Sequence, residues 1–393
     1  MNTLLLAPQV RAYLLENLSV NPSQLVLKGS PFEGITPQEL AQQLVGLQKS
    51  KTKLPLWFNN DKILFPPNLN LEQTSSYLTA QYKSELVSGN TLIDVTGGFG
   101  IDTFYFSKQV EKVVHCELNE NLHHIVCYNL KALNTTSVET YYGDGIQKVL
   151  NSSNVDWIYI DPSRRNDAKG KVFFLEDCLP NVPEHLDALL NKSNKMLIKT
   201  APILDVSIGI KELKYVKELH VVAVKNEVKE LLWVLDINYK SDIHFYATNI
   251  LNEFEKITNE IHQSDLEHSS PTYTNELGDY LYEPNSALLK LGAFNWLSAH
   301  YKVQKLHKHS HLYTNDCEVK FPGKKFKVLK VTSFSKKAMK VYSGFEANVV
   351  SRNFKLSVQE IRKRFRIKES KNTFLFFTTN QKNEQIVIEC ERL

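Results

Sequence analysis

The chain has 393 residues, of which 42% are hydrophobic and 23% are charged, and its formal net charge is +4. This length predicts two or three domains, and the composition is typical of an ordinary globular protein. No apolar run approaches the roughly 18 residues that a membrane span needs, and Arg11 and Glu16 interrupt the N-terminal leucines, which argues against a secretory signal.

The cysteines argue for a reducing compartment. They are odd in number, widely scattered, and contain no Cys-x-x-Cys pair: Cys116, Cys127, Cys178, Cys317 and Cys390. Such a set fits neither a disulfide framework nor a structural zinc site. We therefore expect a cytoplasmic protein with no bound metal.

The N-terminal region, residues 1–85, is predicted to be helical. Apolar residues recur at helical spacing in Leu4–Leu18 and Pro37–Leu47. A further helix is expected to begin near Ser75, with a hydroxyl side chain as its N-cap, and to run to Leu86.

From Thr91 onward, short apolar runs alternate with helical stretches. The runs predicted as strands are Thr91–Val95, Lys112–Cys116, Val138–Tyr142, Asp156–Ile160, Lys195–Lys199, Leu219–Val224 and Leu231–Ile237. The first five are far enough apart for crossover helices, which predicts parallel strands covered by helices on both faces. Only Lys225–Glu230 separates the last two, which predicts an antiparallel hairpin.

The C-terminal part is predicted to be a small α+β module after a connector, Ser241–His268, that contains some helix. Its expected strands are Phe326–Phe334, Ala347–Asn353, Thr373–Thr379 and Gln385–Cys390, with a helix over Ser357–Arg366. Residues 319–371 hold sixteen Lys and Arg against three acids, a local charge of +13. This asymmetry favours a bound polyanion, and a solvated lysine-rich face without a partner is the alternative.

A glycine-rich turn follows the first predicted strand, in the sequence Asp94-Val-Thr-Gly-Gly-Phe-Gly-Ile-Asp102. Glycines let the backbone turn sharply and approach a cofactor closely, and the helix N-terminus beyond them can bind a carboxylate. Thr103 stands where a nicotinamide-binding fingerprint would need its third glycine, which argues against that cofactor. The candidate cofactor-binding residues here are Asp94, Thr96, Gly97, Gly98, Gly100 and Asp102.

Two more acids follow the next two strands. Glu117, followed by Leu118, stands where a carboxylate accepts hydrogen bonds from ribose hydroxyls. Asp144, followed by Gly145, lies after the third strand, where class I methyltransferases bind the adenine amino group. Acids at three successive strand ends predict a site for S-adenosylmethionine (SAM), whose demethylated product is S-adenosylhomocysteine (SAH).

The fourth strand ends in Asp161-Pro162-Ser163-Arg164-Arg165. This resembles the Asp/Asn-Pro-Pro-Tyr and Asp-Pro-Pro-Arg motifs of nucleic-acid methyltransferases, where the acid holds the accepting group against the methyl. Asp161, Pro162, Ser163 and Arg164 are therefore the candidate catalytic residues. Arg165 is expected to contact substrate, for instance a phosphate.

A second set of residues keeps another acceptor open. Lys83, Asp161, Lys199 and Glu230 follow the order of the Lys-Asp-Lys-Glu tetrad of RNA ribose 2′-O-methyltransferases, in which a lysine takes the hydroxyl proton. By contrast, Cys178 lies in a predicted helix without a motif and is interpreted as a core residue, which argues against carbon-5 methylation of uridine. The alternating His307, His309 and His311 lack a carboxylate or cysteine to complete a metal site.

Several motifs together resemble a group of bacterial candidate methyltransferases with a C-terminal THUMP-like domain. The resembling segments are Thr96–Asp102, Tyr159–Arg165, Leu197–Pro202, Tyr282–Asn285, His311–Thr314, Arg352–Phe354 and Ile361–Arg364. The resemblance implies an α/β fold with the seven-stranded Rossmann-like sheet of class I methyltransferases, whose last strand is antiparallel. It also implies a ferredoxin-like segment before the THUMP-like module, and RNA as the partner.

These observations predict four regions: an N-terminal helical region (1–85), a SAM-dependent methyltransferase domain (86–245), a connector with a ferredoxin-like segment (246–318), and a basic THUMP-like domain (319–393). The expected activity is methylation of a base in tRNA or rRNA. The residues expected to bind substrate are Arg165, Lys199, Arg352, Arg362, Lys363, Arg364 and Arg366. The alternatives are a ribose 2′-O-methyltransferase, a protein or small-molecule methyltransferase, and a non-catalytic protein that binds SAM and RNA.

Overall fold

The structure is a computed structural model that describes residues 2–164 and 174–393. Its contacts divide the chain into two compact units. The first comprises Met1–Leu219 and Lys229–Ser241, and the second comprises His220–Val228 and Asp242–Leu393. The chain thus passes from one unit to the other within a strand and returns within the next.

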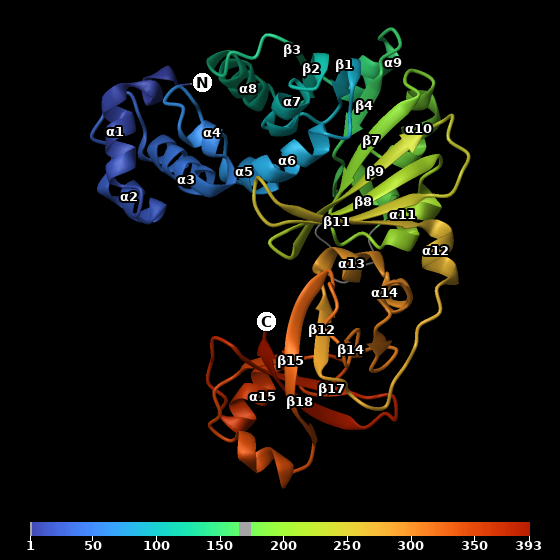
Figure 1. The fold of residues 1–393 in the computed structure, drawn as a ribbon. Coiled ribbons are helices and arrows are strands. Elements are labelled where there is room, and N and C mark those ends of the chain that lie inside the picture. The colour runs from blue at the N-terminus through green and yellow to red at the C-terminus, as the bar shows by residue number, and fades with distance from the viewer. Residues whose placement is uncertain (1, 165–173) are drawn as a thin grey trace. The chain divides into compact units, whose positions relative to one another are not determined.

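The first unit begins with a group of helices, drawn in blue in Figure 1. They are η1 (Thr3–Leu6), α1 (Pro8–Glu16), α2 (Pro22–Lys28), α3 (Pro37–Lys53), α4 (Pro55–Phe58), α5 (Asn68–Gln73) and α6 (Tyr77–Ser84). In α3, Thr36 and Glu39 form a capping box, and Leu40, Leu44 and Leu47 are buried on one face. The predicted helical region is present.

A largely parallel sheet forms the centre of the first unit. Its strands are β1 (Gly89–Asp94), β2 (Val110–Glu117), β3 (Val138–Tyr142), β4 (Trp157–Ile160), β7 (Lys195–Thr200), the first part of β8 (Val216–Val224) and most of β9 (Glu227–Asp236). Within the first unit these strands follow the order β8-β9-β7-β4-β1-β2-β3, which is part of a nine-stranded sheet in the described chain. β9 pairs with β7 in antiparallel orientation, whereas β7, β4, β1, β2 and β3 pair in parallel. The predicted fold class is therefore confirmed.

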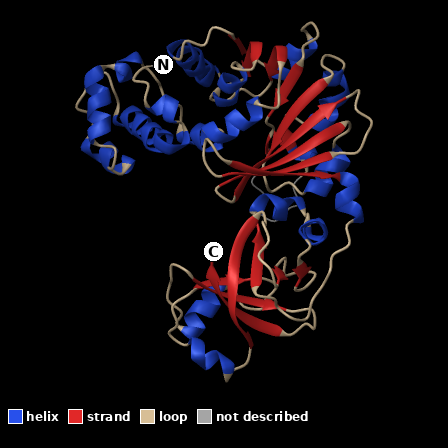
Figure 2. Ribbon diagram, in the orientation of Figure 1, coloured by secondary structure: helices blue, strands red, loops and turns tan. Residues whose placement is uncertain are grey.

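Helices follow most of these strands, and Figure 2 shows them against the sheet. They are α7 (Ile101–Phe106), α8 (Glu120–Ala132), α9 (Gly145–Leu150), α10 (Val182–Leu190) and α11 (Val206–Glu212). All four residues of β4 are buried, as expected of a central strand that is covered on both faces. After β4 come two short strands that pair with each other, β5 (Ser163–Arg164) and β6 (Cys178–Leu179), with η2 (Leu175–Asp177) before β6.

The second unit contains the remaining strands and helices. The strands are β10 (His244–Ile250), β11 (Lys256–His262), β12 (Tyr280–Pro284), β13 (Gln304–Lys305), β14 (Tyr313–Asn315), β15 (Gly323–Ser333), β16 (Asn348–Ser351), β17 (Thr373–Thr379) and β18 (Gln385–Arg392). The helices are α12 (Gln263–His268), α13 (Ser286–Leu291), α14 (Phe294–Tyr301), η3 (Ala338–Tyr342) and α15 (Val358–Phe365). β13 to β18 form a sheet with β12 in the order β13-β14-β12-β15-β18-β17-β16.

Two predicted segments differ from the structure. Ser241–His268 was expected to be a connector with some helix, but it forms the antiparallel hairpin β10–β11 before the short α12. Its strands place polar side chains such as Thr248 and Asn259 among the apolar ones, so their alternation is weak. Cys178, expected in a helix, begins β6, although it is fully buried as predicted.

Among residues 2–164 and 174–393, no helix combines the length and the apolar character that crossing a membrane requires.

Candidate active site

The glycine turn after β1 has little room for side chains. Gly98 and Gly100 have φ values of 55° and 78°, in the left-handed region that favours glycine. A Cβ atom on Gly97 would lie 2.1 Å from the ring of His115 on β2. The backbone of this turn therefore lies directly against the sheet.

Asp94, at the end of β1, is fully buried and orders the turn from below. Its Oδ1 accepts a hydrogen bond from the Thr96 N–H (3.1 Å), and its Oδ2 accepts one from the Thr103 hydroxyl (2.6 Å). The same hydroxyl lies 2.9 Å from Nδ1 of His115. Burial raises the pKa of Asp94 to about 8 and lowers the pKa of His115 to about 3.

Glu117, at the end of β2, is tied to the same turn. Its Oε2 accepts a hydrogen bond from the Gly98 N–H (3.1 Å) and its Oε1 accepts one from the Asn119 N–H (2.7 Å). Burial raises the pKa of Glu117, and these backbone N–H groups oppose that rise. The next side chain, Leu118, is 70% exposed and leaves an apolar surface open beside the carboxylate.

Asp144 follows β3 and caps α9. Its Oδ1 accepts hydrogen bonds from the N–H groups of Ile146 (2.8 Å) and Gln147 (3.4 Å), while its Oδ2 accepts none from the described residues. A Cβ atom on Gly145 would lie 2.3 Å from the carbonyl oxygen of Val95. Glycine at this position thus lets α9 begin directly beside the end of β1.

The ends of these three neighbouring strands fit an adenosyl cofactor. β1, β2 and β3 are adjacent and parallel, so Asp94, Glu117 and Asp144 lie along one edge of the sheet. Glu117 and Asp144 can accept hydrogen bonds from a ribose and an adenine amino group, and Leu118 offers apolar contact. Asp94, unlike Glu117, is fully buried and bonded to Thr96 and Thr103, so it can act only by ordering the turn.

The turn after β4, residues 161–163, is joined to the glycine turn; we call it the acceptor turn after its predicted role. The N–H of Asp161 donates to the Thr96 hydroxyl (2.7 Å). Pro162 is buried, and Ser163 is exposed in β5, opposite Leu179 of β6. Arg165 and the side chain of Arg164 lie outside the described part of the chain.

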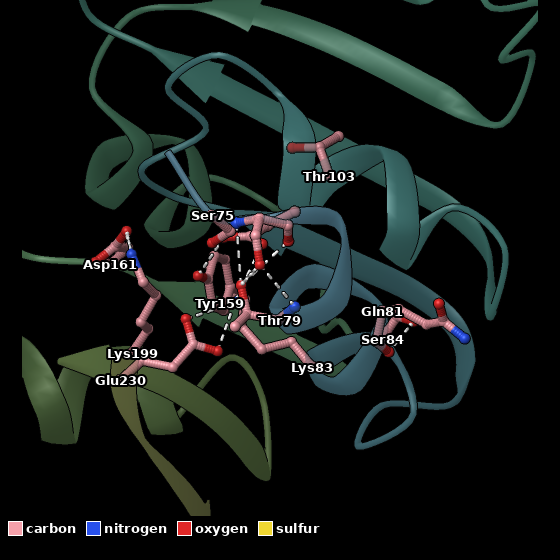
Figure 3. Close-up of polar contacts among 12 residues, drawn as sticks. Ser75, Thr79, Gln81, Lys83, Ser84, Thr103, Tyr159, Asp161, Lys199 and Glu230 are labelled. Atoms are coloured by element: carbon pink, nitrogen blue, oxygen red, sulfur yellow. Dashed lines mark hydrogen bonds and ion pairs between the residues drawn. The ribbon is translucent and has the colours of Figure 1, made fainter. Parts of the chain in front are cut away.

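The four residues of the predicted tetrad lie close together in the structure, as Figure 3 shows. Nζ of Lys83, on α6, lies 2.8 Å from both carboxylate oxygens of Glu230 on β9. Lys199, on β7, forms an ion pair with Asp161. The Lys83–Glu230 pair is buried, with exposures of 0% and 2%, whereas the side chains of Lys199 and Asp161 are 13% and 31% exposed.

Asp102 belongs to the same network. Its carboxylate lies 3.4 Å from Nζ of Lys83 and accepts hydrogen bonds from the hydroxyls of Ser75 (2.9 Å) and Tyr159 (2.8 Å). Asp102 was predicted as a cofactor ligand, and in the structure its carboxylate contacts Ser75, Lys83 of α6 and Tyr159 of β4. Ser75 and Tyr159 were not predicted as site residues, although Tyr159 stands two residues before Asp161 in the motif.

The carboxylates of this network set its protonation. Burial lowers the pKa of Lys199, but the nearby Asp161, Glu230 and Asp102 outweigh it and raise that pKa above its ordinary value. Burial raises the pKa of Glu230, and Lys83 and Lys199 oppose that rise. Lys199 is therefore an ammonium ion beside Asp161 at neutral pH.

The predicted basic residues of the second unit lie on or near α15. Lys363, Arg364 and Arg366 are exposed, and they make no ion pair with the described residues. Arg362 pairs with Glu369 (2.6 Å), and Arg352 pairs with Glu283 (2.7 Å), which is buried. The structure thus gives this surface three uncompensated cations, while Arg352 serves an internal ion pair.

The alternating histidines lie in the loop between β13 and β14, where His307 and His309 are neighbours and His311 packs elsewhere. Nδ1 of His307 accepts hydrogen bonds from the Asn353 side chain (2.9 Å) and the His309 N–H (3.1 Å). His311 stacks on Phe294 at 3.7 Å. These contacts give the loop a structural role.

Comparisons with known proteins agree with this architecture. Residues 280–322 match a family of ferredoxin-like domains, and residues 323–392 match a family of THUMP domain-like modules. A crystal structure of a candidate methyltransferase from Porphyromonas gingivalis W83 matches with a TM-score of 0.86 and 28% sequence identity, over 97% of each chain. The chain is thus a close structural match to a candidate methyltransferase and carries ferredoxin-like and THUMP-like segments, which confirms the resemblance drawn from its sequence.

Two further matches are restricted to part of the chain. A candidate methyltransferase from Streptococcus mutans in complex with SAH has 18% identity and a TM-score of 0.30, over 40% of this chain and 95% of that chain. An rRNA methylase from Streptococcus thermophilus has 14% identity and a TM-score of 0.29, over 40% and 93%. A search of curated proteins found no match.

Proposed function

We propose that this protein is a SAM-dependent methyltransferase that modifies RNA, with residues 86–245 carrying the transfer and residues 319–393 holding the RNA. The observation that carries the proposal is the hydrogen bond from the Asp161 N–H to Thr96, which places the acceptor turn against the glycine turn. When bound, SAM supplies an activated methyl group, so the protein must chiefly align the acceptor and remove its proton.

The residues divide this work. Glu117 and Asp144 bind the nucleoside part of the cofactor, and the free N–H groups at the start of α7 receive its carboxylate. Pro162 stiffens the turn that presents Asp161. The exposed Lys363, Arg364 and Arg366 hold phosphates of the RNA.

Between a base and a ribose hydroxyl as the acceptor, the tetrad favours the hydroxyl. Lys199 and Asp161 are the more accessible ion pair, and the Lys83–Glu230 ion pair of the same network is buried. Because Lys199 is an ammonium ion, it cannot take the hydroxyl proton as the lysine of the 2′-O-methyltransferase tetrad does. It would instead stabilise negative charge that develops on an acceptor oxygen, and the Asp161 carboxylate would take the proton. A base nitrogen or carbon would have less need of this cation.

The test uses RNA from cells that lack the gene. Purified protein and isotopically labelled SAM should transfer label to that RNA, and nucleoside analysis should identify a 2′-O-methyl nucleoside. Asp161→Ala should abolish transfer but leave SAM affinity, measured by calorimetry, within about threefold of the original. Label on a base instead would reject the ribose acceptor, and no label on any RNA class would reject the RNA substrate.

A further inference from the structure

We propose that His244, Glu260 and His262 form a binding site for a divalent transition-metal ion such as Zn²⁺. These residues lie on the β10–β11 hairpin of the second unit, and the inference does not depend on the proposed function. Their ligand atoms, one from each side chain, all lie within 4.8 Å of one another. The set differs from the three histidines at 307, 309 and 311 that the sequence drew attention to.

The strand register brings the three side chains to one face. His244 lies directly opposite His262 in the antiparallel ladder, and Glu260 is paired with Tyr246, two residues further along each strand. Because side chains alternate between faces along a strand, these four residues share a face. The two histidine rings meet edge to face at 4.4 Å.

The spacing is close to that of a metal site. In tetrahedral sites with metal–ligand distances of about 2.0–2.2 Å, ligand atoms lie about 3.3–3.6 Å apart. Nδ1 of His244 is already 3.2 Å from Oε1 of Glu260. His262 and Glu260 are exposed, so modest side-chain rotations can bring in the third ligand.

The Glu260 carboxylate is also oriented by a hydrogen bond from a neighbouring side chain. The Tyr246 hydroxyl donates to Oε1 of Glu260 (3.2 Å), and the Tyr246 ring stacks on His220 at 4.5 Å. Outer hydrogen bonds of this kind orient ligating carboxylates. Two imidazoles and one carboxylate suit Zn²⁺ and its first-row neighbours better than Mg²⁺ or Ca²⁺, which prefer oxygen ligands.

Three protein ligands leave at least one coordination position to solvent. The metal would join β10 to β11 through side chains, in addition to their backbone hydrogen bonds. We therefore expect Zn²⁺ to stabilise this hairpin and to raise the melting temperature of the chelator-treated, full-length protein.

The experiment titrates the chelator-treated full chain with ZnCl₂ in a calorimeter. The expected result is saturation at one equivalent, which His262→Asn abolishes and Tyr246→Phe weakens by about tenfold. The matched control is His268→Asn, an exposed histidine of α12 that lies outside the cluster and should leave the affinity unchanged. Circular dichroism of each metal-free variant checks that it is folded.

Two outcomes would overturn the proposal. One is the absence of a saturable equivalent in the unsubstituted chain. The other is an affinity in folded His262→Asn equal to that of His268→Asn, which would locate any bound Zn²⁺ elsewhere.

Discussion

Asp94 and Asp161 both stand at the ends of parallel strands, but their surroundings give them different tasks. Asp94 is fully buried, and both of its oxygens are bonded within the turn. Asp161 is partly exposed and paired with Lys199. Asp94 therefore orders the glycine turn, and Asp161 is the one that the proposed function makes available to an acceptor.

His115 makes stability depend on pH. Its pKa in the folded protein is about 3, below its ordinary value, so the unfolded chain binds more protons between about pH 3 and 6.5. Stability from neutral His115 is fully present above pH 6.5 and is lost as the pH falls through this range. The stability lost through His115 between pH 6.5 and pH 5.5 is about 1 kcal/mol.

The matched variant is His115→Gln, which cannot take up the proton. Urea unfolding at pH 6.5 and pH 5.5 gives the free energy of unfolding of both proteins. The decrease between the two pH values should be about 1 kcal/mol smaller in the variant. Identical pH profiles for the two proteins would mean that His115 is not a buried neutral group.

The Lys83–Glu230 pair predicts a strong coupling. Lys83→Met leaves a buried carboxylate without its main cation, and we expect a loss of about 3 kcal/mol in the free energy of unfolding. Lys83→Met combined with Glu230→Leu should recover most of that loss. Chemical denaturation of both single variants and the double variant measures the coupling, and additive effects would contradict it.

At the scale of elements, α15 combines a firm start with a charged surface. Ser357 and Glu360 form a capping box, and Ile361 is the buried residue of the helix. Lys363, Arg364 and Arg366 are left exposed without carboxylate partners in the described chain. The helix and its C-cap residue Arg366 thus present these three cations to solvent.

Changing Lys363, Arg364 and Arg366 together to Gln should weaken RNA binding. It should also lower the dependence of log affinity on log salt concentration by about 2–3, because fewer counterions are released. Filter binding at several salt concentrations measures both effects. Arg362→Gln is the control, since Arg362 already pairs with Glu369 and should change the slope little. Equal effects of the two changes would remove α15 from the RNA-binding surface.

The elements also show how far sequence patterns reach. The five parallel strands and the glycine turn were predicted because apolar runs and Gly97–Gly100 are local signals. The hairpin β10–β11 was missed because polar residues such as Thr248 and Asn259 stand among its apolar ones and weaken the alternation. The pairing of His244 with His262 across the strands depends on the fold. Lys83, Asp161, Lys199 and Glu230 could be placed in order along the chain, but their pairing depends on the fold.

For the whole molecule, cofactor binding should appear as stability of the first unit, which contains every residue proposed to hold SAM. SAM at 100 times its dissociation constant should add about 2.7 kcal/mol to the unfolding free energy of that unit. Scanning calorimetry of the full chain, with and without SAM, measures the shift. An unchanged thermogram would contradict the proposed cofactor.

Lys83 lies on α6, which precedes the first strand of the sheet in the sequence. Its charge is neutralised by Glu230 on β9, the last strand of the first unit in the sequence. A shortened chain that began at β1 would keep every glycine and acid of the cofactor motif. It would nevertheless leave the Glu230 carboxylate without Lys83 and lose the hydrogen bond from the Ser75 hydroxyl to Asp102. The N-terminal helical region is thus a structural part of the proposed transfer site, and a shortened chain made to test methyl transfer should retain it.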